Sequence, residues 1–252
     1  MPSLYLLARP QFTPEYQRFL AAQHEVWLET AATDAERLLE FAGRICYMSF
    51  GSRQSPRDNF SFIRHLIDQG HESVLEHASW TFLLDSVSRS FTHQLVRHRI
   101  GFSFSQLSQQ YYDHTEAEFL PPPGIENSPA ALAAWRAAIE AARQAYRTIE
   151  TQLRSDASDG DAGREWLRAL RSAARSVLPN ATATKIVVTA NGRSLRHFLA
   201  LRGSTAGDLE MRQVAGLLYA MLLDEAPSLV SDFENSAGQN EIPLITRRHI
   251  RA

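Results

Sequence analysis

Cysteine is nearly absent from the sequence, which contains only Cys46 among its 252 residues. One cysteine excludes an intramolecular disulfide framework and any zinc site built from several cysteines. This usage is typical of a reducing compartment, so we expect cytoplasmic localisation. Cys46 lies among Ile45, Tyr47 and Met48, and this apolar setting predicts a packed thiol rather than a nucleophile.

Long hydrophobic runs are also missing, because no apolar stretch approaches the ~20 residues that a transmembrane helix requires. Residues 1–3 do not form the charged start of a secretory signal, so we expect neither export nor membrane binding. A chain of 252 residues with 44% hydrophobic content buries a sizeable core. The default prediction is a single domain over residues 1–252.

The chain has no excess of positive charge, since its formal net charge is −2 at pH 7. This balance argues against a general nucleic-acid-binding protein, and any positive site must be local. A glycine-rich G-x-G-x-x-G pattern and a phosphate-loop lysine are both absent, which argues against a doubly wound nucleotide-binding fold. Phosphate groups must therefore be bound mainly by side chains.

Periodic apolar residues predict mostly helices with a few strands. Predicted helices cover residues 33–48, 60–69, 88–99, 130–153, 164–177, 193–201 and 208–223, and predicted strands cover residues 79–84 and 185–189. The apolar stripe of the first helix consists of Ala35, Leu38, Leu39, Ala42 and Ile45. The proline-rich run 120–124 must be a loop, and residues 156–163 form a polar connection.

A first polar cluster begins at Arg97, His98 and Arg99 and continues through serines and glutamines to Tyr111. The predicted helix 88–99 places Gln94, Arg97 and His98 on one face. Guanidinium groups bind phosphate through two parallel hydrogen bonds, and serine and glutamine complete such a shell without added charge. The segment therefore predicts a buried site for a phosphorylated ligand, with a solvated basic turn as the alternative.

A second polar cluster accompanies the predicted helix 193–201. It consists of Asn191, Arg193, Arg196, His197 and Arg202. Leu195, Phe198 and Leu199 form the packing face of this helix, and a surface charge stripe is the alternative interpretation. Earlier in the chain, His71 and His77 are six residues apart, whereas a helical zinc pair needs a spacing of about four. We therefore predict no metal site, and a hydrogen-bonding role for His71.

Several blocks resemble, in order and spacing, the signature of the flavin-dependent thymidylate synthases. The blocks are Gly70-His71-Glu72-Ser73 through His77, Gln94 through Arg97-His98-Arg99, Ser103 through Tyr111, Arg175 through Pro179, and Asn191 through Arg202. Together they span about residues 42–233. Several ordered blocks are more specific than one motif.

The resemblance implies an enzyme that methylates C5 of a uridylate, with FAD as cofactor, methylenetetrahydrofolate as carbon donor and NADPH as reductant. It also implies a homotetramer whose FAD sites are assembled from more than one subunit. The residues that it places at the FAD are His71, Arg97, His98, Arg99, Asn191, Arg193 and His197. Those that it places around the nucleotide are Gln94, Gln106, Ser108, Gln110, Arg175 and Arg202. It places His71 and Tyr111 beside the folate. The implied fold is α+β, with helices packed on a small, mainly antiparallel sheet.

The implied chemistry agrees with the residue types. Carbon transfer and reduction belong to flavin and folate, so the protein supplies positioning and electrostatics. Arg202, facing the uracil carbonyl groups, would act catalytically by favouring the electron-rich ring. No enzyme nucleophile is required, whereas a cysteine-dependent thymidylate synthase needs an activated thiolate, and Cys46 has no evident activating partner.

Two departures from the family pattern bear on substrate choice. The family usually has an arginine where Gln110 stands, and the segment Ile100-Gly101-Phe102 is one residue longer than usual, with Gly101 able to absorb the extra residue. Gln110 offers both a donor and an acceptor, as a sugar hydroxyl requires. The enzyme is therefore expected to act on dUMP, UMP or both. The alternative is a flavin- and nucleotide-binding homologue that has lost catalysis.

Overall fold

A computed structural model describes residues 1–157, 163–206, 208–237 and 242–248. The chain contacts group into two compact units. Unit 1 contains Met1–Ser3, Leu84–Arg97 and Ser105–Ile186, and unit 2 contains Leu4–Leu83, His98–Phe104 and Val187–Ala252. Most of the connection predicted at residues 156–163 lies outside the described residues.

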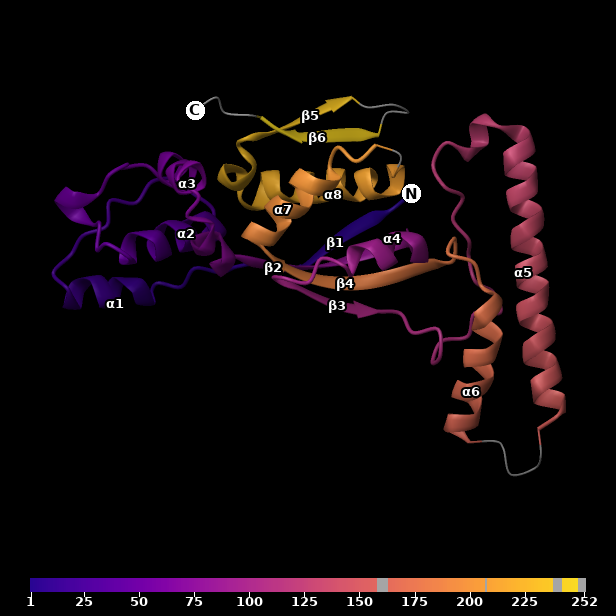
Figure 1. The fold of residues 1–252 in the computed structure, drawn as a ribbon. Coiled ribbons are helices and arrows are strands. Elements are labelled where there is room, and N and C mark those ends of the chain that lie inside the picture. The colour runs from indigo at the N-terminus through magenta and orange to yellow at the C-terminus, as the bar shows by residue number, and fades with distance from the viewer. Residues whose placement is uncertain (158–162, 207, 238–241, 249–252) are drawn as a thin grey trace. The chain divides into compact units, whose positions relative to one another are not determined.

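The elements alternate irregularly between helix and strand along the chain (Figure 1). The α-helices are α1 (Glu15–Ala22), α2 (Asp34–Ile45), α3 (Asn59–Asp68), α4 (Arg89–Leu95), α5 (Pro129–Ser155), α6 (Arg164–Ala174), α7 (Gly192–Arg202) and α8 (Leu209–Glu225). The 3-10 helices are η1 (Gly51–Arg53), η2 (Glu72–His77), η3 (Ile125–Asn127), η4 (Arg175–Val177) and η5 (Pro227–Val230). The strands are β1 (Ser3–Ala8), β2 (Ser79–Ser88), β3 (Phe102–Gln106), β4 (Ala183–Asn191), β5 (Phe233–Ala237) and β6 (Pro243–Arg247).

Four strands pair in the order β1-β2-β4-β3. The hydroxyl groups of Thr81 and Thr189 lie 2.9 Å apart, and Asp85 pairs with Lys185 at 3.5 Å. Residue numbers therefore fall along β4 as they rise along β2, as antiparallel pairing requires. Strands β5 and β6 form a separate antiparallel ribbon. These sheets, with the many helices, confirm the predicted α+β class.

In unit 1, helices α5 and α6 run side by side (Figure 1). Helix α5 begins where its sequence indicates, because the Ser128 side chain accepts a hydrogen bond from the Ala131 amide and Pro129 occupies the first turn. Tyr146 and Leu170 are buried within this unit.

In unit 2, the apolar faces of α7 and α8 pack together and β6 lies against α8 (Figure 1). The predicted packing face of α7 is confirmed, because Leu195, Phe198 and Leu199 are fully buried. Asn191 caps the helix by accepting a hydrogen bond from the Ser194 amide. No helix among the described residues is long and apolar enough to cross a membrane.

The predicted apolar stripe of helix α2 is confirmed in part, because Ala35 and Leu39 are buried and its other members are partly buried. The helix also buries Glu36, Glu40 and Arg44, which the stripe does not predict. Cys46, at the end of this helix, is exposed, so the prediction of a packed thiol is wrong. The polar face can be buried because partners from other segments satisfy each of its charged groups.

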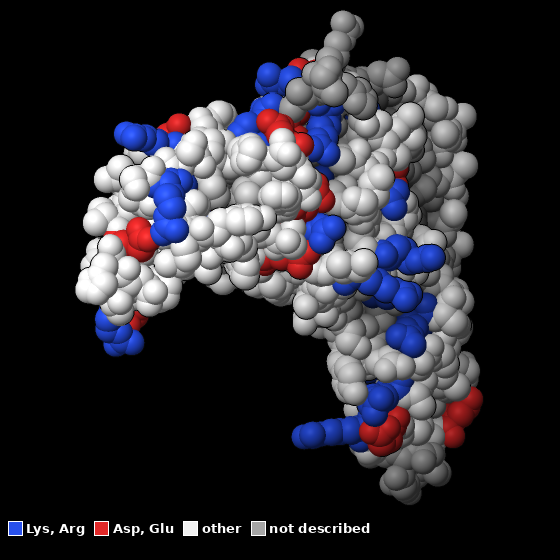
Figure 2. All heavy atoms as spheres, turned by 60° about the vertical axis from the view of Figure 1, so that its left-hand side comes forward, with Lys and Arg blue, Asp and Glu red and all other residues white. Residues whose placement is uncertain are grey.

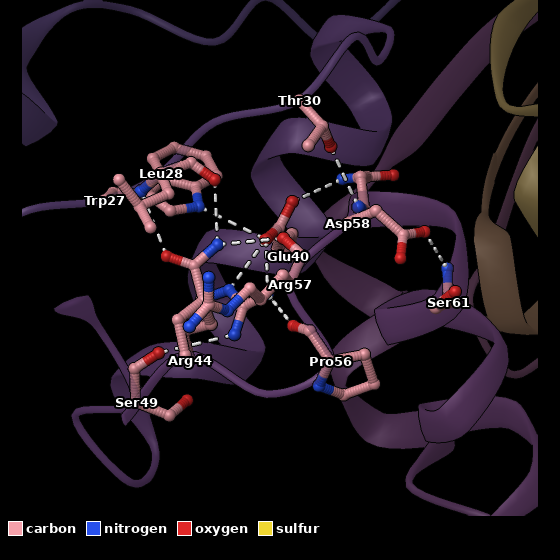
Figure 3. A network of polar contacts seen from close by, with 12 residues as sticks. Trp27, Leu28, Thr30, Glu40, Arg44, Ser49, Pro56, Arg57, Asp58 and Ser61 are labelled. Carbon is pink, nitrogen blue, oxygen red and sulfur yellow. Dashed lines mark hydrogen bonds and ion pairs between the residues drawn. The ribbon is translucent and has the colours of Figure 1, made fainter. Parts of the chain in front are cut away.

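Glu40 and Arg44 form the centre of this buried network (Figure 3). Glu40 accepts hydrogen bonds from Trp27 Nε1 at 3.2 Å, Arg44 Nε at 2.7 Å and Asn59 Nδ2 at 2.8 Å. Arg44 also donates to the carbonyl oxygen of Pro56 at 2.7 Å. An ion pair this buried is tolerated only because its remaining lone pairs and protons are hydrogen-bonded.

We expect Glu40→Gln to lower the free energy of unfolding by about 3–5 kcal/mol, because the Arg44 charge would remain buried without a counter-charge. Urea unfolding at fixed protein concentration measures this loss. The matched control is Glu15→Gln, since the Glu15–Arg18 pair is exposed and should contribute no more than about 1 kcal/mol. Equal losses in the two variants would contradict a central role for the buried pair.

Candidate functional site

The segment that carries the first polar cluster is not one helix. Helix α4 ends at Leu95, and the Arg97 amide bonds to the Gln94 carbonyl oxygen in a tight turn. Arg97, His98 and Arg99 therefore follow the helix, and the prediction that Gln94, Arg97 and His98 share a helical face is wrong. Gln94 and Arg97 belong to unit 1, whereas His98 and Arg99 belong to unit 2.

Gly101 explains why the chain turns here. Its φ of +71° lies in the left-handed region, and a Cβ at this position would overlap Ser194 Oγ and lie 2.6 Å from Asn191 Nδ2. The Gly101 carbonyl oxygen accepts a hydrogen bond from the Asn191 amide at 3.2 Å, and Ser194 Oγ donates to the Ile100 carbonyl oxygen at 2.8 Å. The turn 98–101 is thus docked on the N-terminus of α7. The predicted role of Gly101 in absorbing the extra residue agrees with this conformation.

This docking brings part of the first cluster to the second cluster. Arg202 Nε donates a hydrogen bond to His98 Nε2 at 3.2 Å. The His98 ring also lies 6.5 Å from the His197 ring, measured between centroids. Burial, with the charges of Arg202 and His197, lowers the pKa of His98. His98, His197 and Arg202 therefore form one polar group within unit 2.

The remaining cations of the second cluster have carboxylate partners. Arg193 pairs with Glu76 at 2.7 Å and with Glu72 at 3.5 Å, and the hydrogen bond to Glu76 is the main cause of its raised pKa. Both glutamates lie on η2, directly after the exposed His71. Arg196 is different, because it is buried and donates two hydrogen bonds to Asp232, at 2.7 and 2.9 Å. Arg196 is therefore a structural residue, and the cluster is more than a solvated charge stripe.

Unit 1 contains most of the positions predicted around a nucleotide. Gln106 Nε2 donates to Thr92 Oγ1 at 2.9 Å, which fixes the orientation of its amide. Ser108 Oγ accepts a hydrogen bond from the Gln110 amide at 3.2 Å, and Gln110 Nε2 lies 3.4 Å from Ser172 Oγ on α6. These half-buried groups are neutral, as expected for a shell around a sugar or base.

Helix α6 also holds Tyr111, which is predicted to contact the folate. Arg171 Nη1 donates to the Tyr111 carbonyl oxygen at 2.7 Å, and the Arg168 guanidinium lies 5.0 Å from the Tyr111 ring centroid. The Tyr111 side chain itself is 64% exposed. The backbone of this residue is thus fixed, while its ring remains accessible to a flat ligand.

Arg89 is a second cation whose electrostatics involve Arg175, the residue predicted to bind the substrate phosphate, and it was not identified from the sequence. Burial and the positive charge of Arg175 lower the pKa of Arg89. Neither guanidinium forms an ion pair among the residues that the structure describes. Arg89 occupies the first turn of α4, where the helix dipole disfavours a cation. This conflict with a local rule is the signal that could have identified Arg89 from the sequence.

His114 lies in the electrostatic field of Arg89 and Arg171. It is buried, its Nε2 has no hydrogen-bond partner among the described residues, and burial with the charge of Arg89 lowers its pKa. On the face drawn in Figure 2, several Lys and Arg side chains lie together with few Asp or Glu side chains among them. Local positive charge in a chain of net charge −2 agrees with the expectation from composition.

The predicted positions divide between the two units by their ligand. All predicted flavin positions except Arg97 lie in unit 2, and all predicted nucleotide positions except Arg202 lie in unit 1. Within unit 2, the structure brings His98, His197 and Arg202 together. Within unit 1, it brings Gln110 to α6, and the positive charge of Arg175 acts on Arg89.

Comparison with known proteins supplies independent information. The profile of a family described as thymidylate synthase complementing protein matches residues 28–228. A flavin-dependent thymidylate synthase of Mycolicibacterium gilvum is 44% identical over 234 residues, which cover 92% of this chain and 90% of that protein. The protein of the same name from Mycobacterium sp. (strain KMS) is 45% identical over 236 residues, 91% of this chain and 89% of its own. That of Mycobacterium leprae is 44% identical over 225 residues, 87% of each chain.

We expect Gly101→Ala to destabilise the protein, because the new Cβ would displace the turn from α7 in addition to straining a positive φ. The matched control is Gly70→Ala, since Gly70 has a φ of +70° but no atom within 4 Å of a Cβ. The loss of unfolding free energy in Gly101→Ala should exceed that in the control by about 1–3 kcal/mol. Urea unfolding of both variants measures the difference, and equal losses would exclude a specific docking contact.

Proposed function

The chain belongs to the family of flavin-dependent thymidylate synthases, and from that premise we propose that it is a methyltransferase that methylates C5 of a uridylate, either dUMP or UMP. FAD is the proposed cofactor, methylenetetrahydrofolate the carbon donor and NADPH the reductant. The products are dTMP or 5-methyl-UMP. We further propose a cytoplasmic homotetramer of single-domain chains that binds neither nucleic acid nor membranes.

The donor set in unit 2 fits a flavin dinucleotide. FAD carries two phosphates and an aromatic ring that is anionic when reduced, so it requires cations, polar groups and flat side chains. Unit 2 supplies Arg99, Arg193, Asn191, His71, His98 and His197. When bound, the flavin supplies the electrons that reduce the transferred carbon. Glu72 and Glu76 orient Arg193, and the docked turn positions His98.

The observation that carries the proposal is the contact between His98 and Arg202, which lie 104 residues apart in the sequence. It joins a proposed flavin residue to the proposed catalytic residue. A guanidinium beside the uracil carbonyl groups stabilises negative charge on the ring and so favours attack of C5 on the one-carbon unit. The folate is expected to stack on the flavin near His71 and Tyr111.

The nucleotide site is proposed to hold the phosphate between Arg175 and Arg89. The charge of Arg175 disfavours the charged form of Arg89, neither group has a carboxylate partner among the described residues, and a dianionic phosphate would relieve the repulsion. The neutral groups of Gln94, Gln106 and Ser108 would then contact the sugar and base. Arg89 thus takes over part of the charge that the family usually provides at the position of Gln110.

Gln110 supports UMP as a substrate beside dUMP. Its Nε2 faces Ser172, so its amide oxygen is the group available to accept a hydrogen bond from a ribose 2'-hydroxyl. A tolerated substitution in an ordinary dUMP enzyme is the competing interpretation. Both nucleotides are therefore proposed as substrates.

A catalytically inactive flavin- and nucleotide-binding homologue is the second candidate function. Two features favoured it, namely Gln110 and the extra residue near Gly101. The extra residue does not favour an inactive protein, because the Gly101 turn fits closely against α7. Catalysis is therefore the better supported proposal.

The decisive experiment is the absorption spectrum of the purified protein, followed by assays with dUMP and UMP in the presence of methylenetetrahydrofolate and NADPH. We expect a flavin spectrum and NADPH oxidation coupled to a methylated nucleotide. A yellow protein without product would indicate the inactive homologue. A colourless protein that does not take up FAD would overturn the proposed function, and a strong preference for dUMP would exclude the ribonucleotide hypothesis.

We expect Gln110→Arg to shift the ratio of kcat/KM values toward dUMP, because arginine removes the acceptor for the 2'-hydroxyl and adds a cation for the phosphate. Competition between the two nucleotides measures this ratio directly. Ser172→Ala is the control, because it removes the partner of Gln110 but retains the amide. An unchanged ratio in Gln110→Arg would show that position 110 does not select the sugar.

We expect Arg89→Gln to raise KM for the nucleotide by about tenfold to a hundredfold, as the loss of one charge-assisted hydrogen bond of ~1.5–3 kcal/mol predicts. Arg136→Gln is the control, because Arg136 is an exposed cation in the same unit. Steady-state kinetics with flavin-loaded protein measure both constants. If the two variants retained the same KM, Arg89 would not bind the phosphate.

A further inference from the structure

Arg202 is the last residue of α7, and its main chain is held firmly. The Ile245 amide of β6 donates to the carbonyl oxygen of the next residue, Gly203, at 3.0 Å. A Cβ at Gly203 would lie 2.5 Å from the Ile245 carbonyl oxygen, so the helix end and β6 are in close contact. The remaining freedom of Arg202 is therefore in its long side chain, which costs entropy to order.

His98 makes the contact that restricts this side chain. Arginine nitrogens are donors only, so His98 Nε2 must be the acceptor in the 3.2 Å hydrogen bond from Arg202 Nε. His98 is then a neutral imidazole whose proton lies on Nδ1. No other hydrogen bond is made by the guanidinium in the described part of the chain, so its two terminal nitrogens remain available to a ligand.

The His98 ring is itself fixed by its neighbours. It lies 5.1 Å from the Phe198 ring and 5.9 Å from the Phe102 ring, measured between centroids. The titratable and charged groups that face it are Arg202 and His197. Burial and these two groups favour the neutral form that the hydrogen bond requires.

We propose that His98 is a positioning residue for Arg202, which it orients through the Nε hydrogen bond so that both terminal nitrogens bind the pyrimidine. This role is distinct from any contact of His98 with the flavin, and it rests on the proposed function only in the identity of the ligand. Protonation of His98 removes the acceptor and places a second positive charge beside Arg202. Nucleotide binding therefore weakens as pH falls through the pKa of His98, which lies below the ordinary histidine value.

The first experiment compares dUMP affinity by calorimetry across pH in wild type and in His98→Gln, both flavin-loaded. Glutamine Oε1 retains an acceptor near the position of Nε2 but does not titrate. The nucleotide phosphate titrates near pH 6 in both proteins. The ratio of the two affinities therefore isolates His98. We expect the dUMP affinity of wild type, divided by that of His98→Gln, to fall about tenfold between neutral and acidic pH. A ratio that does not change with pH would overturn the proposal.

Two further variants separate positioning from packing. His98→Leu retains bulk without an acceptor and should bind dUMP about tenfold more weakly at neutral pH, whereas His98→Gln should restore binding. Arg202→Lys keeps the charge but has no Nε–H group, so its loss of affinity on acidification should be smaller than that of wild type. Equal affinity of the leucine and glutamine variants would indicate a role in packing alone.

Nitrogen NMR of wild-type protein with labelled histidine tests the hydrogen bond without any ligand. The His98 signal, assigned by its loss in His98→Gln, should report a neutral ring protonated at Nδ1 at neutral pH. A proton on Nε2 would overturn the inference even if the enzyme proves active. Conversely, failure to bind FAD or dUMP would refute the proposed function, while this measurement would still decide the role of His98.

Discussion

The attachment of the turn at residues 98–101 to the N-terminus of α7 is the constraint on which the proposed site in unit 2 depends. Gly101 permits close approach because it has no side chain, and Asn191 and Ser194 use the same helix N-terminus to hold the turn. Because of this attachment, a histidine from the first polar cluster reaches an arginine from the second. The chemistry proposed for the protein depends on this contact between His98 and Arg202.

The distribution of charge follows from the same organisation. The guanidinium groups of Arg44 and Arg196 have carboxylate partners, are buried and stabilise the fold. Those without such partners, Arg89 and Arg175, lie where an anion is expected. A buried or crowded cation is costly unless it is neutralised. Carboxylate pairing therefore marks Arg44 and Arg196 as structural residues, whereas Arg89 and Arg175 are proposed to bind an anion.

Much of unit 1 and unit 2 follows from local sequence. Helices α3, α5, α7 and α8 were predicted within a few residues, because apolar periodicity and caps such as Ser128 and Asn191 act over one or two turns. Strands β1, β3, β5 and β6 were not predicted. Short strands depend on pairing partners distant in sequence, so their residues carry a weak local signal.

The sequence by itself determined the main helices and the residue types available for an anionic ligand, and its resemblance to a known family implied the α+β class. The tertiary structure alone decided that Glu36, Glu40 and Arg44 of α2 are buried, that Cys46 is exposed, where α4 ends and that the charge of Arg175 acts on Arg89. In each case the deciding partner comes from a distant segment. Burial of Glu40 and Arg44 depends on Trp27, Asn59 and Pro56, and no periodicity within α2 encodes those contacts. Local patterns report the preferences of a segment, whereas desolvation and charge pairing depend on what the fold places beside it.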